Sequence, residues 1–333
     1  MSKKSSKRKA SIKSSILLLL LIAILLIAST YAWFTANKTV TISSLNVNVE
    51  AKNGLQISTD AQNWKAVISN EDITKNAYTG NKNQIPTTME PVSTVGTVTD
   101  GFMGMFYGTA APGDTGSYEL TAEATESEAQ GATGKFIAFD IFLKADKAMQ
   151  LSLTTNSKVT SAASEKGLQN ASRVAFCLLG NGAADTLPAT AQGWKKTGTL
   201  GDGTTYLWEP NADSHTSVAA ASANSTYYGG ASTVKAGTGQ APITYYGVNK
   251  AIVAGVPLSQ VNNGKGGDAF TQVTPTASTN ATMDAATQIF TVQQGITKVR
   301  VYMWVEGQDV DCDNSASGTD LTFDLQLEAP EGN

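Results

Sequence analysis

The chain has 333 residues, with 24 lysines and arginines, 28 aspartates and glutamates, one histidine and two cysteines. Six of the basic residues precede residue 35 and no acidic residue accompanies them, so the remainder carries 18 basic against 28 acidic side chains, a net charge of −10. Such a body lacks the clustered basic surface that nucleic acids and anionic lipids require. With 41% hydrophobic and only 16% charged residues, it is predicted to be globular and mostly β.

The first 32 residues form a predicted signal peptide. A basic stretch runs into thirteen apolar residues at 16–28, and the small residues that follow predict cleavage by a signal peptidase between Ala32 and Trp33. The alternative is a retained membrane anchor, because the mostly apolar run continues to Phe34. In both cases the basic flank places the body outside the cytoplasm, with membrane contact only through this N-terminal segment before cleavage.

The strand pattern that follows, at 39–51, changes phase part-way. Val40 and Ile42 share one face, whereas the apolar residues after Ser44 fall on the other parity. One strand buries both sets on one face only if a bulge intervenes. Alternatively, residues 33–43 are a separate N-terminal arm, and the β domain begins at residue 44.

Further strands are predicted from alternating or continuous apolar runs. The run at 135–144 reads as a central strand covered on both faces. Residues 299–306 and 321–328 are predicted to form a C-terminal pair of strands with one core face. The other predicted strands are 55–58, 117–122, 149–154 and 173–179, and short helices are expected at 160–169 and around 60–68.

The segment from about 180 to 295 is rich in Gly, Ser, Thr and Asn. We interpret it as a long insertion in a β-sandwich, with an independently folded lobe as the alternative. If its aromatic side chains are exposed, they would stack on sugars, so a membrane-anchored monomeric surface module that binds carbohydrate is a second hypothesis for function. These aromatics are Trp194, Trp208, Tyr227, Tyr228, Tyr245 and Tyr246.

Signatures of catalysis are sparse, and no enzyme activity is predicted. The single histidine, His215, lies in a loop-like stretch, so a zinc motif with two histidines is impossible and a solvated loop residue is the expected reading. The two cysteines, Cys177 and Cys312, are predicted to form a disulfide because the chain is exported. That bridge would stabilise the fold by about 4 to 5 kcal/mol in the chain-entropy model, and two buried thiols are the alternative.

One segment is predicted to bind calcium. Residues 309–320, here called the aspartate loop, place acidic side chains at positions 1, 3, 5 and 12 of a twelve-residue loop, as a calcium loop does. The match is incomplete, because Asn314 stands where glycine is expected and strands flank the loop. A plain acidic turn is therefore the alternative. The four predicted ligands are Asp309, Asp311, Asp313 and Asp320.

Four short segments resemble the TasA/camelysin-like surface and matrix proteins of Gram-positive bacteria. The end of the signal, 30–35 (TYAWFT), looks like the export signal that a SipW-type peptidase processes in those proteins. Residues 44–49 (SLNVNV) resemble their first strand, and 111–114 (APGD) resemble a turn before a later strand. Residues 304–312 look like a motif of surface proteins that carry the same signal. The region from 180 to 295 has no recognised counterpart.

The resemblance implies a jelly-roll β-sandwich that is secreted to the cell surface and polymerises head to tail with copies of itself. In this mode the arm of one subunit, including Trp33, Phe34, Val40 and Ile42, fills a groove in the next. The implied function is a structural subunit of an extracellular fibre or biofilm matrix. A camelysin-like protease is the third hypothesis, disfavoured by the placement of the only histidine.

Overall fold

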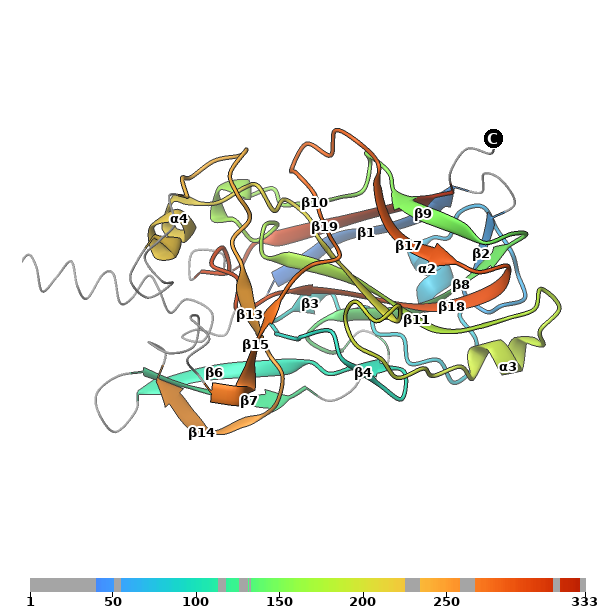
Figure 1. Cartoon of the computed structure of the whole chain (residues 1–333), viewed down its shortest axis with the longest axis horizontal. Helices are drawn as coiled ribbons and strands as arrows, with labels where there is room; N and C mark the ends of the chain where they lie inside the picture. The colour runs from blue at the N-terminus through green and yellow to red at the C-terminus, as the bar shows by residue number, and fades with distance from the viewer. Residues whose placement is uncertain are drawn as a thin grey trace, which may run out of the picture.

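The computed structural model describes residues 40–50, 55–112, 118–125, 131, 133–224, 234–257, 267–313 and 318–329, and these form an all-β protein (Figure 1). The predicted all-β class is confirmed. Two large sheets are surrounded by three small sheets and a few short helices. Within the described ranges, no helix is both long and apolar enough to cross a membrane. The predicted signal peptide, Trp33 and Phe34 lie outside these ranges.

Sheet A has the strand order β17-β9-β19-β1-β3, with β10 also paired to β19. Residues of β19 alternate between buried and partly buried, so one face of this strand lies in the core. β1 runs parallel to β19, whereas β9 and β10 run antiparallel to it. The strands are β1 (Val40–Glu50), β3 (Thr88–Met89), β9 (Met149–Leu153), β10 (Lys158–Thr160), β17 (Thr287–Val292) and β19 (Asp320–Glu328).

Sheet B has the order β16-β12-β11-β18-β8-β2. All eleven residues of its central strand β18 are buried, which requires cover on both faces. One face packs against sheet A in a core that includes Phe139, Phe176 and Phe323. The other face carries a second apolar cluster that includes Tyr302 and Trp304. The strands are β2 (Leu55–Ser58), β8 (Ile137–Ala145), β11 (Ser172–Gly182), β12 (Thr205–Glu209), β16 (Ala277–Ser278) and β18 (Gly295–Val305).

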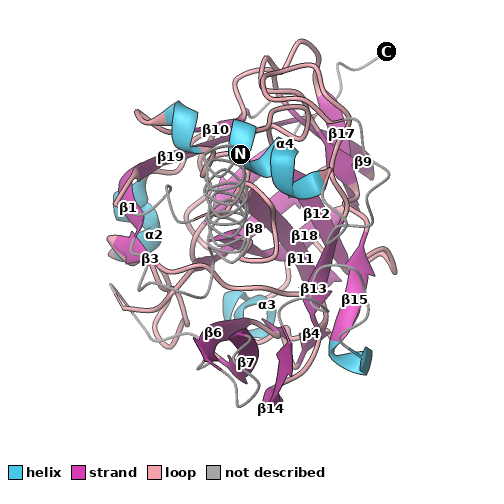
Figure 2. Ribbon diagram, turned by 90° about the vertical axis from the view of Figure 1, so that its left-hand side faces the viewer, coloured by secondary structure: helices cyan, strands magenta, loops and turns pink. Residues whose placement is uncertain are grey.

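The small sheets lie beside the sandwich, and the sheet of β6, β7 and β14 lies at its lower edge (Figures 1 and 2). Their strands are β4 (Val98–Thr99), β5 (Phe102–Met103), β6 (Phe106–Pro112), β7 (Tyr118–Ala124), β13 (Tyr245–Val248), β14 (Ile252–Pro257) and β15 (Phe270–Val273). The helices are α2 (Asn70–Thr74), α3 (Pro188–Gln192) and α4 (Ser217–Ala223), with 3-10 turns at Ser164–Lys166 and Gly267–Ala269. The Ser69 side chain caps α2, and the Thr216 side chain caps α4.

Several sequence predictions need correction. The two C-terminal strands form as expected but do not pair, since β18 lies inside sheet B and β19 inside sheet A. No helix forms over 60–68, because the Asp60 carboxylate accepts the N–H groups of Gln62 and Asn63 at 2.8 Å each and fixes a turn. At 160–169 only a 3-10 turn forms, which ends at Gly167 with a φ of 78°.

The segment 180–295 is not a simple insertion. Strands β12 and β16 extend sheet B, and β17 forms an edge of sheet A, so three strands from this segment belong to the two main sheets. Composition misled the prediction because these strands are short and are separated by long polar connections. The aromatic residues are affected as well: Trp208 and Tyr245 are buried in the core, so neither presents a stacking surface to a sugar.

The phase change in the first strand is accommodated by a bulge. β1 is one continuous strand, and its register against β19 shifts between Ile42 and Ser44. Val40 pairs with Met89 of β3, and Ile42 pairs with Leu321 of β19. The expected separation of an arm at residue 43 is therefore wrong for residues 40–43 in this structure, since they belong to the protein's own sheet.

Candidate functional site

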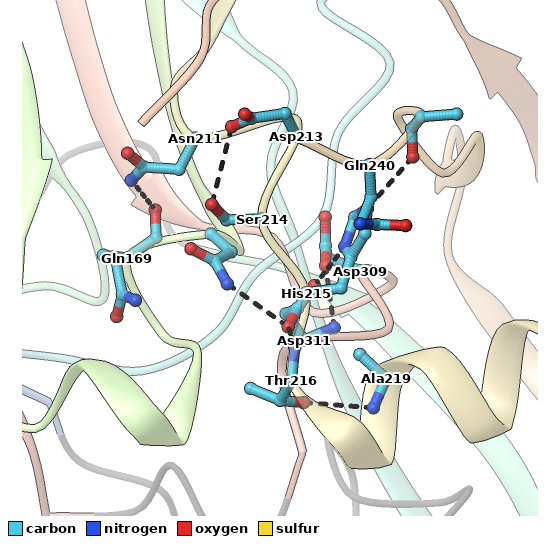
Figure 3. Close-up of polar contacts among 12 residues, drawn as sticks. Gln169, Asn211, Asp213, Ser214, His215, Thr216, Ala219, Gln240, Asp309 and Asp311 are labelled. Atoms are coloured by element: carbon cyan, nitrogen blue, oxygen red, sulfur yellow. Dashed lines mark hydrogen bonds and ion pairs between the residues drawn. The ribbon is translucent and has the colours of Figure 1, made fainter. Parts of the chain in front are cut away.

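A polar cavity of 440 Å³ lies where the 180–295 segment meets the loop that follows β10. Hydroxyl and amide side chains dominate its lining, among them Ser161, Gln169, Asn170, Asn211 and Ser214. Figure 3 shows Gln169, Asn211 and Ser214 of this group, together with Thr216 at the start of α4. A cavity with such a lining suits a ligand that offers several hydroxyl groups, because each wall residue exchanges hydrogen bonds with them.

His215 forms part of the cavity wall and is held on both ring nitrogens. Its Nδ1 lies 2.9 Å from Oδ2 of Asp311, and its Nε2 lies 3.1 Å from the backbone carbonyl oxygen of Ala241. The residue is only 8% exposed, so the expectation of a solvated loop histidine is wrong. Burial lowers the pKa of His215, but the hydrogen bond and charge of Asp311 together with the Ala241 carbonyl raise it above 6.5 overall.

This geometry favours a structural role for His215 over that of a catalytic base. Both partners are hydrogen-bond acceptors, so the arrangement favours an imidazolium that donates from each nitrogen. Such a ring has no lone pair with which to take a proton from a serine. The neighbouring Ser214 hydroxyl lies 3.5 Å from the Asp213 carboxylate, and the ring nitrogens bond elsewhere.

Asp311 ties the two walls of the cavity together. Its Oδ1 accepts the backbone N–H of Thr216 at 2.9 Å and the side-chain amide of Asn170 at a longer 3.4 Å. With the bond to His215, this buried carboxylate bridges the start of α4 and the loop before β11. Thr216 in turn accepts the N–H of Ala219 at 3.0 Å, which fixes the first turn of α4 (Figure 3).

Two side-chain oxygens in the cavity wall remain unsatisfied. Oε1 of Gln169 and Oδ1 of Asn170 are buried and accept no hydrogen bond from any described residue. The backbone here is firmly held, because the Asn211 amide donates to the carbonyls of Val159 and Gln169 at 3.0 Å each. A buried carbonyl oxygen without a donor costs about 1 to 3 kcal/mol.

The predicted calcium loop is not assembled in the described residues. Asp309 bonds the guanidinium of Arg173 at 2.5 Å, Asp311 bonds His215, and Asp320 accepts the N–H of Ala162 at 3.2 Å. Asp313 is also buried. Within the parts of the chain that the structure describes, no three acidic, histidine or cysteine side chains are gathered to hold a metal ion. Asp309, Asp311 and Asp320 each have a protein partner here, and calcium binding by the loop stays a prediction.

Arg173 is the centre of a buried charge cluster that sequence reasoning missed. It has no exposed surface and bonds Glu209 at 2.6 Å in addition to Asp309. Its guanidinium also lies 4.9 Å from the ring centre of Tyr245. Glu306, equally buried nearby, has a pKa raised to about 7, chiefly by burial. The predicted strand at 173–179 gave no sign of this cluster, which lies under the second apolar layer over sheet B.

The predicted disulfide is not formed, and this expectation is corrected. Cys177 and Cys312 are both buried thiols. Cys177 belongs to the cluster on the outer face of sheet B, whereas Cys312 belongs to the core between the sheets. Cys312 follows Asp311, whose carboxylate bonds Asn170 just before β11. Cys177 lies five residues further along β11 than its first residue, Ser172, which is about 16 Å along the strand. A disulfide needs Cα atoms within about 7 Å.

No family model, no curated protein and no solved structure matches this chain.

Proposed function

We propose that the protein is a secreted structural subunit of an extracellular fibre or biofilm matrix, which polymerises by exchanging its N-terminal strand between copies. The observation that carries the proposal is the position of β1. It lies in parallel along β19 from Thr41, opposite Asp320, to Glu50, opposite Glu328. Figure 1 shows the two strands side by side, one from each end of the chain.

The attachment of β1 is one-sided over most of its length. On its other edge, the pairs formed within the described ranges reach only Val40 and Thr41, which face β3. Most of its inter-strand hydrogen bonds therefore go to β19. Residues 51–54 connect β1 to β2, which belongs to the other sheet. A terminal strand held along one edge is replaceable by the same strand of another copy, with every main-chain bond re-formed.

The side chains of β19 explain why the position must be filled. Leu321, Phe323, Leu325 and Leu327 point into the core and are at most 1% exposed. Without β1, this apolar strand would present its unpaired N–H and C=O groups at a sheet edge, which promotes association. If residues 1–32 are cleaved on export, the N-terminal part of the chain that includes β1 is released from the membrane. It is then able to pair with β19 of a neighbouring copy. Contacts of this kind run head to tail and do not close, so they build filaments.

The sequence supports the same proposal independently. The cleavage pattern at Ala32, the first-strand segment 44–49 and the aromatic residues Trp33 and Phe34 all resemble the TasA/camelysin-like proteins. Under this proposal the protein lies at the surface of a Gram-positive-type cell, and its sandwich has the jelly-roll topology of those proteins. Assembly needs no cofactor and no enzyme activity of this chain.

Negative-stain electron microscopy of the exported protein tests the proposal. We expect filaments that lengthen with concentration. Ile42→Asp should abolish them, because Ile42 pairs with the buried Leu321, whereas Thr41→Asp is a matched control at an exposed position. Exported protein that stays monomeric at high concentration would contradict the fibre function. Filaments that survive Ile42→Asp would contradict the role of β1.

The polar cavity favours a second candidate function, a surface module that binds a hydroxylated ligand such as a carbohydrate. The hydroxyl and amide side chains of its lining, among them Gln169 and Asn170, are the observation behind it. Titration calorimetry with monosaccharides tests this function. Asn170→Ala should abolish the binding heat, whereas Asn156→Ala, at an exposed turn, should leave it unchanged. Absence of heat with every sugar would remove this candidate.

A further inference from the structure

A second cavity, of 330 Å³, is lined by residues of α3 and by side chains of β8 and β18 in sheet B. Its lining includes Lys82, Lys195, Lys298 and Arg300 but only one carboxylate, that of Asp140. This is unusual in a body whose net charge is −10. Cationic groups that converge on a cavity attract an anion from solution more strongly than the same groups on an open surface.

Three buried charged side chains of the lining, those of Lys298, Arg300 and Asp140, form one cluster. The Asp140 carboxylate accepts a hydrogen bond from Arg300 at 2.7 Å and one from Lys298 at 3.1 Å. It also accepts the hydroxyl of Tyr78 at 2.5 Å. All three charged side chains are at most 4% exposed. The Lys298 ammonium also donates to the Gln192 carbonyl oxygen at 2.7 Å, and the Arg300 guanidinium to the Lys82 carbonyl oxygen at 2.7 Å. One carboxylate therefore balances only one of two buried cations, so the cluster places a net positive charge beside the cavity.

The rim adds a cation that is able to move onto a ligand. The Lys195 ammonium is half exposed and lies 3.6 Å from the carboxylate of Asp100, which is itself 72% exposed. A pair so open to solvent is weak, so Lys195 exchanges partners at little cost. The Phe102 ring contacts both the rim cation and the buried cluster. Its centre lies 5.6 Å from the Lys195 ammonium and 5.6 Å from the Arg300 guanidinium.

We infer that this cavity binds a small molecule that carries an oxyanion, a carboxylate or a phosphate, next to an apolar group. The oxyanion would lie between Lys195 and the buried Lys298–Arg300 pair, and the apolar part would pack on Phe102 and Leu179. The volume is that of a pocket for a small ligand. Burial lowers the pKa of Lys298, and the charges of Arg300 and Lys195 lower it further. A bound anion would oppose that effect by favouring the charged lysine.

Titration calorimetry on the full chain at constant ionic strength tests the inference, because salt screens exposed charges equally in all samples. The probes are benzoate, inorganic phosphate and, as an uncharged match for benzoate, benzyl alcohol. We expect saturable binding of at least one oxyanion and none of benzyl alcohol. Binding of benzoate alone identifies a carboxylate ligand, and binding of phosphate alone identifies a phosphate ligand.

Three variants locate the site. Lys195→Gln should weaken binding about tenfold through loss of one charge-assisted hydrogen bond, and Lys298→Met should abolish it. Lys158→Gln removes the same charge from an exposed position on β10 and should change nothing. If Lys298→Met does not fold, Phe102→Leu replaces it and should weaken benzoate binding. Failure of all oxyanions to bind, or equal weakening by Lys158→Gln, would overturn the inference.

Discussion

Replacing Asp311 by asparagine tests whether this carboxylate holds the polar cavity together. The substitution keeps the shape of the side chain and removes its charge. One oxygen remains to accept the Thr216 N–H, but the new amide group faces Nδ1 of His215, which lies 2.9 Å from the wild-type oxygen. An imidazolium donates from that nitrogen, so two donors would face each other.

The expected cost follows from the bond that is lost. A hydrogen bond to a charged group contributes about 1.5 to 3 kcal/mol. We therefore expect Asp311→Asn to lower the free energy of unfolding by about 2 to 3 kcal/mol near pH 6. Near pH 8.5 the loss should fall to about 1 kcal/mol, because a neutral His215 accepts from the new amide at Nδ1 while Nε2–H still donates to Ala241.

The direction of the pH dependence follows from the raised pKa of His215. Although burial lowers this pKa, the bonds to Asp311 and Ala241 bring it above the ordinary 6.5 in the folded protein. The pair therefore contributes its full stabilisation below pH 6.5 and loses it as the pH rises through the folded pKa. The pKa of Asp309 is raised by burial and by the nearby Asp311 charge, so removing that charge lowers the repulsion on ionised Asp309. This gain is present only where Asp309 is ionised. Both effects therefore make the loss of unfolding free energy in the variant largest at acidic pH.

Urea unfolding of wild type and variant at pH 6 and 8.5 measures this difference. Asp213→Asn is the matched control, because Asp213 lies two residues from His215. Among the described residues, its carboxylate accepts from the N–H groups of Gly239 and Ala281 and from the Ser214 hydroxyl. Its cost should be small and equal at both pH values. A deficit for Asp311→Asn that is below 0.5 kcal/mol, or that is the same at both pH values, would refute the proposed imidazolium bridge.

Three other outcomes are expected. Arg173→Met should lower the free energy of unfolding by about 3 to 5 kcal/mol in urea titrations, because it leaves the buried carboxylates of Glu209 and Asp309 unpaired; a loss under 1 kcal/mol would contradict their burial. Thiol labelling of unreduced protein should modify Cys177 and Cys312 only after denaturation, and an absence of labelling would restore the disulfide. Millimolar calcium should leave the melting temperature unchanged relative to chelator, because the aspartate loop already has protein partners; a rise would show that it rearranges around the ion.

The β class and most central strands were predictable, because burial leaves a local pattern. The run at 135–144 is continuous in apolar residues, and β8 is indeed covered on both faces. β18 is different: its charged and aromatic residues alternate with aliphatic ones, which predicted a single core face. Arg300 is nevertheless 1% exposed, because its partner Asp140 comes from β8, 160 residues earlier. A strand's own sequence does not reveal such a distant partner.

The candidate site was least predictable for the same reason. His215 and Asp311 are 96 residues apart, and the sequence around each suggests an exposed polar loop. Spacing within residues 309–320 suggested a shared cation, whereas Asp309, Asp311 and Asp320 each bond a residue from a different part of the chain. The phase change at Ser43-Ser44, in contrast, is a local feature, and it correctly marked the bulge in β1.

Whether β1 passes between copies is tested most directly by mixing two single-cysteine-addition variants. Asn46 lies in register with Asp324 of β19, so chains carrying Asn46→Cys are mixed with chains carrying Asp324→Cys and then oxidised. Glu50→Cys mixed with Asp324→Cys is the control, since position 50 lies four residues, about 13 Å, further along the strand. We predict a mixed disulfide dimer on a non-reducing gel with Asn46→Cys and none with Glu50→Cys. Filaments that form without that cross-link would contradict strand exchange through β1.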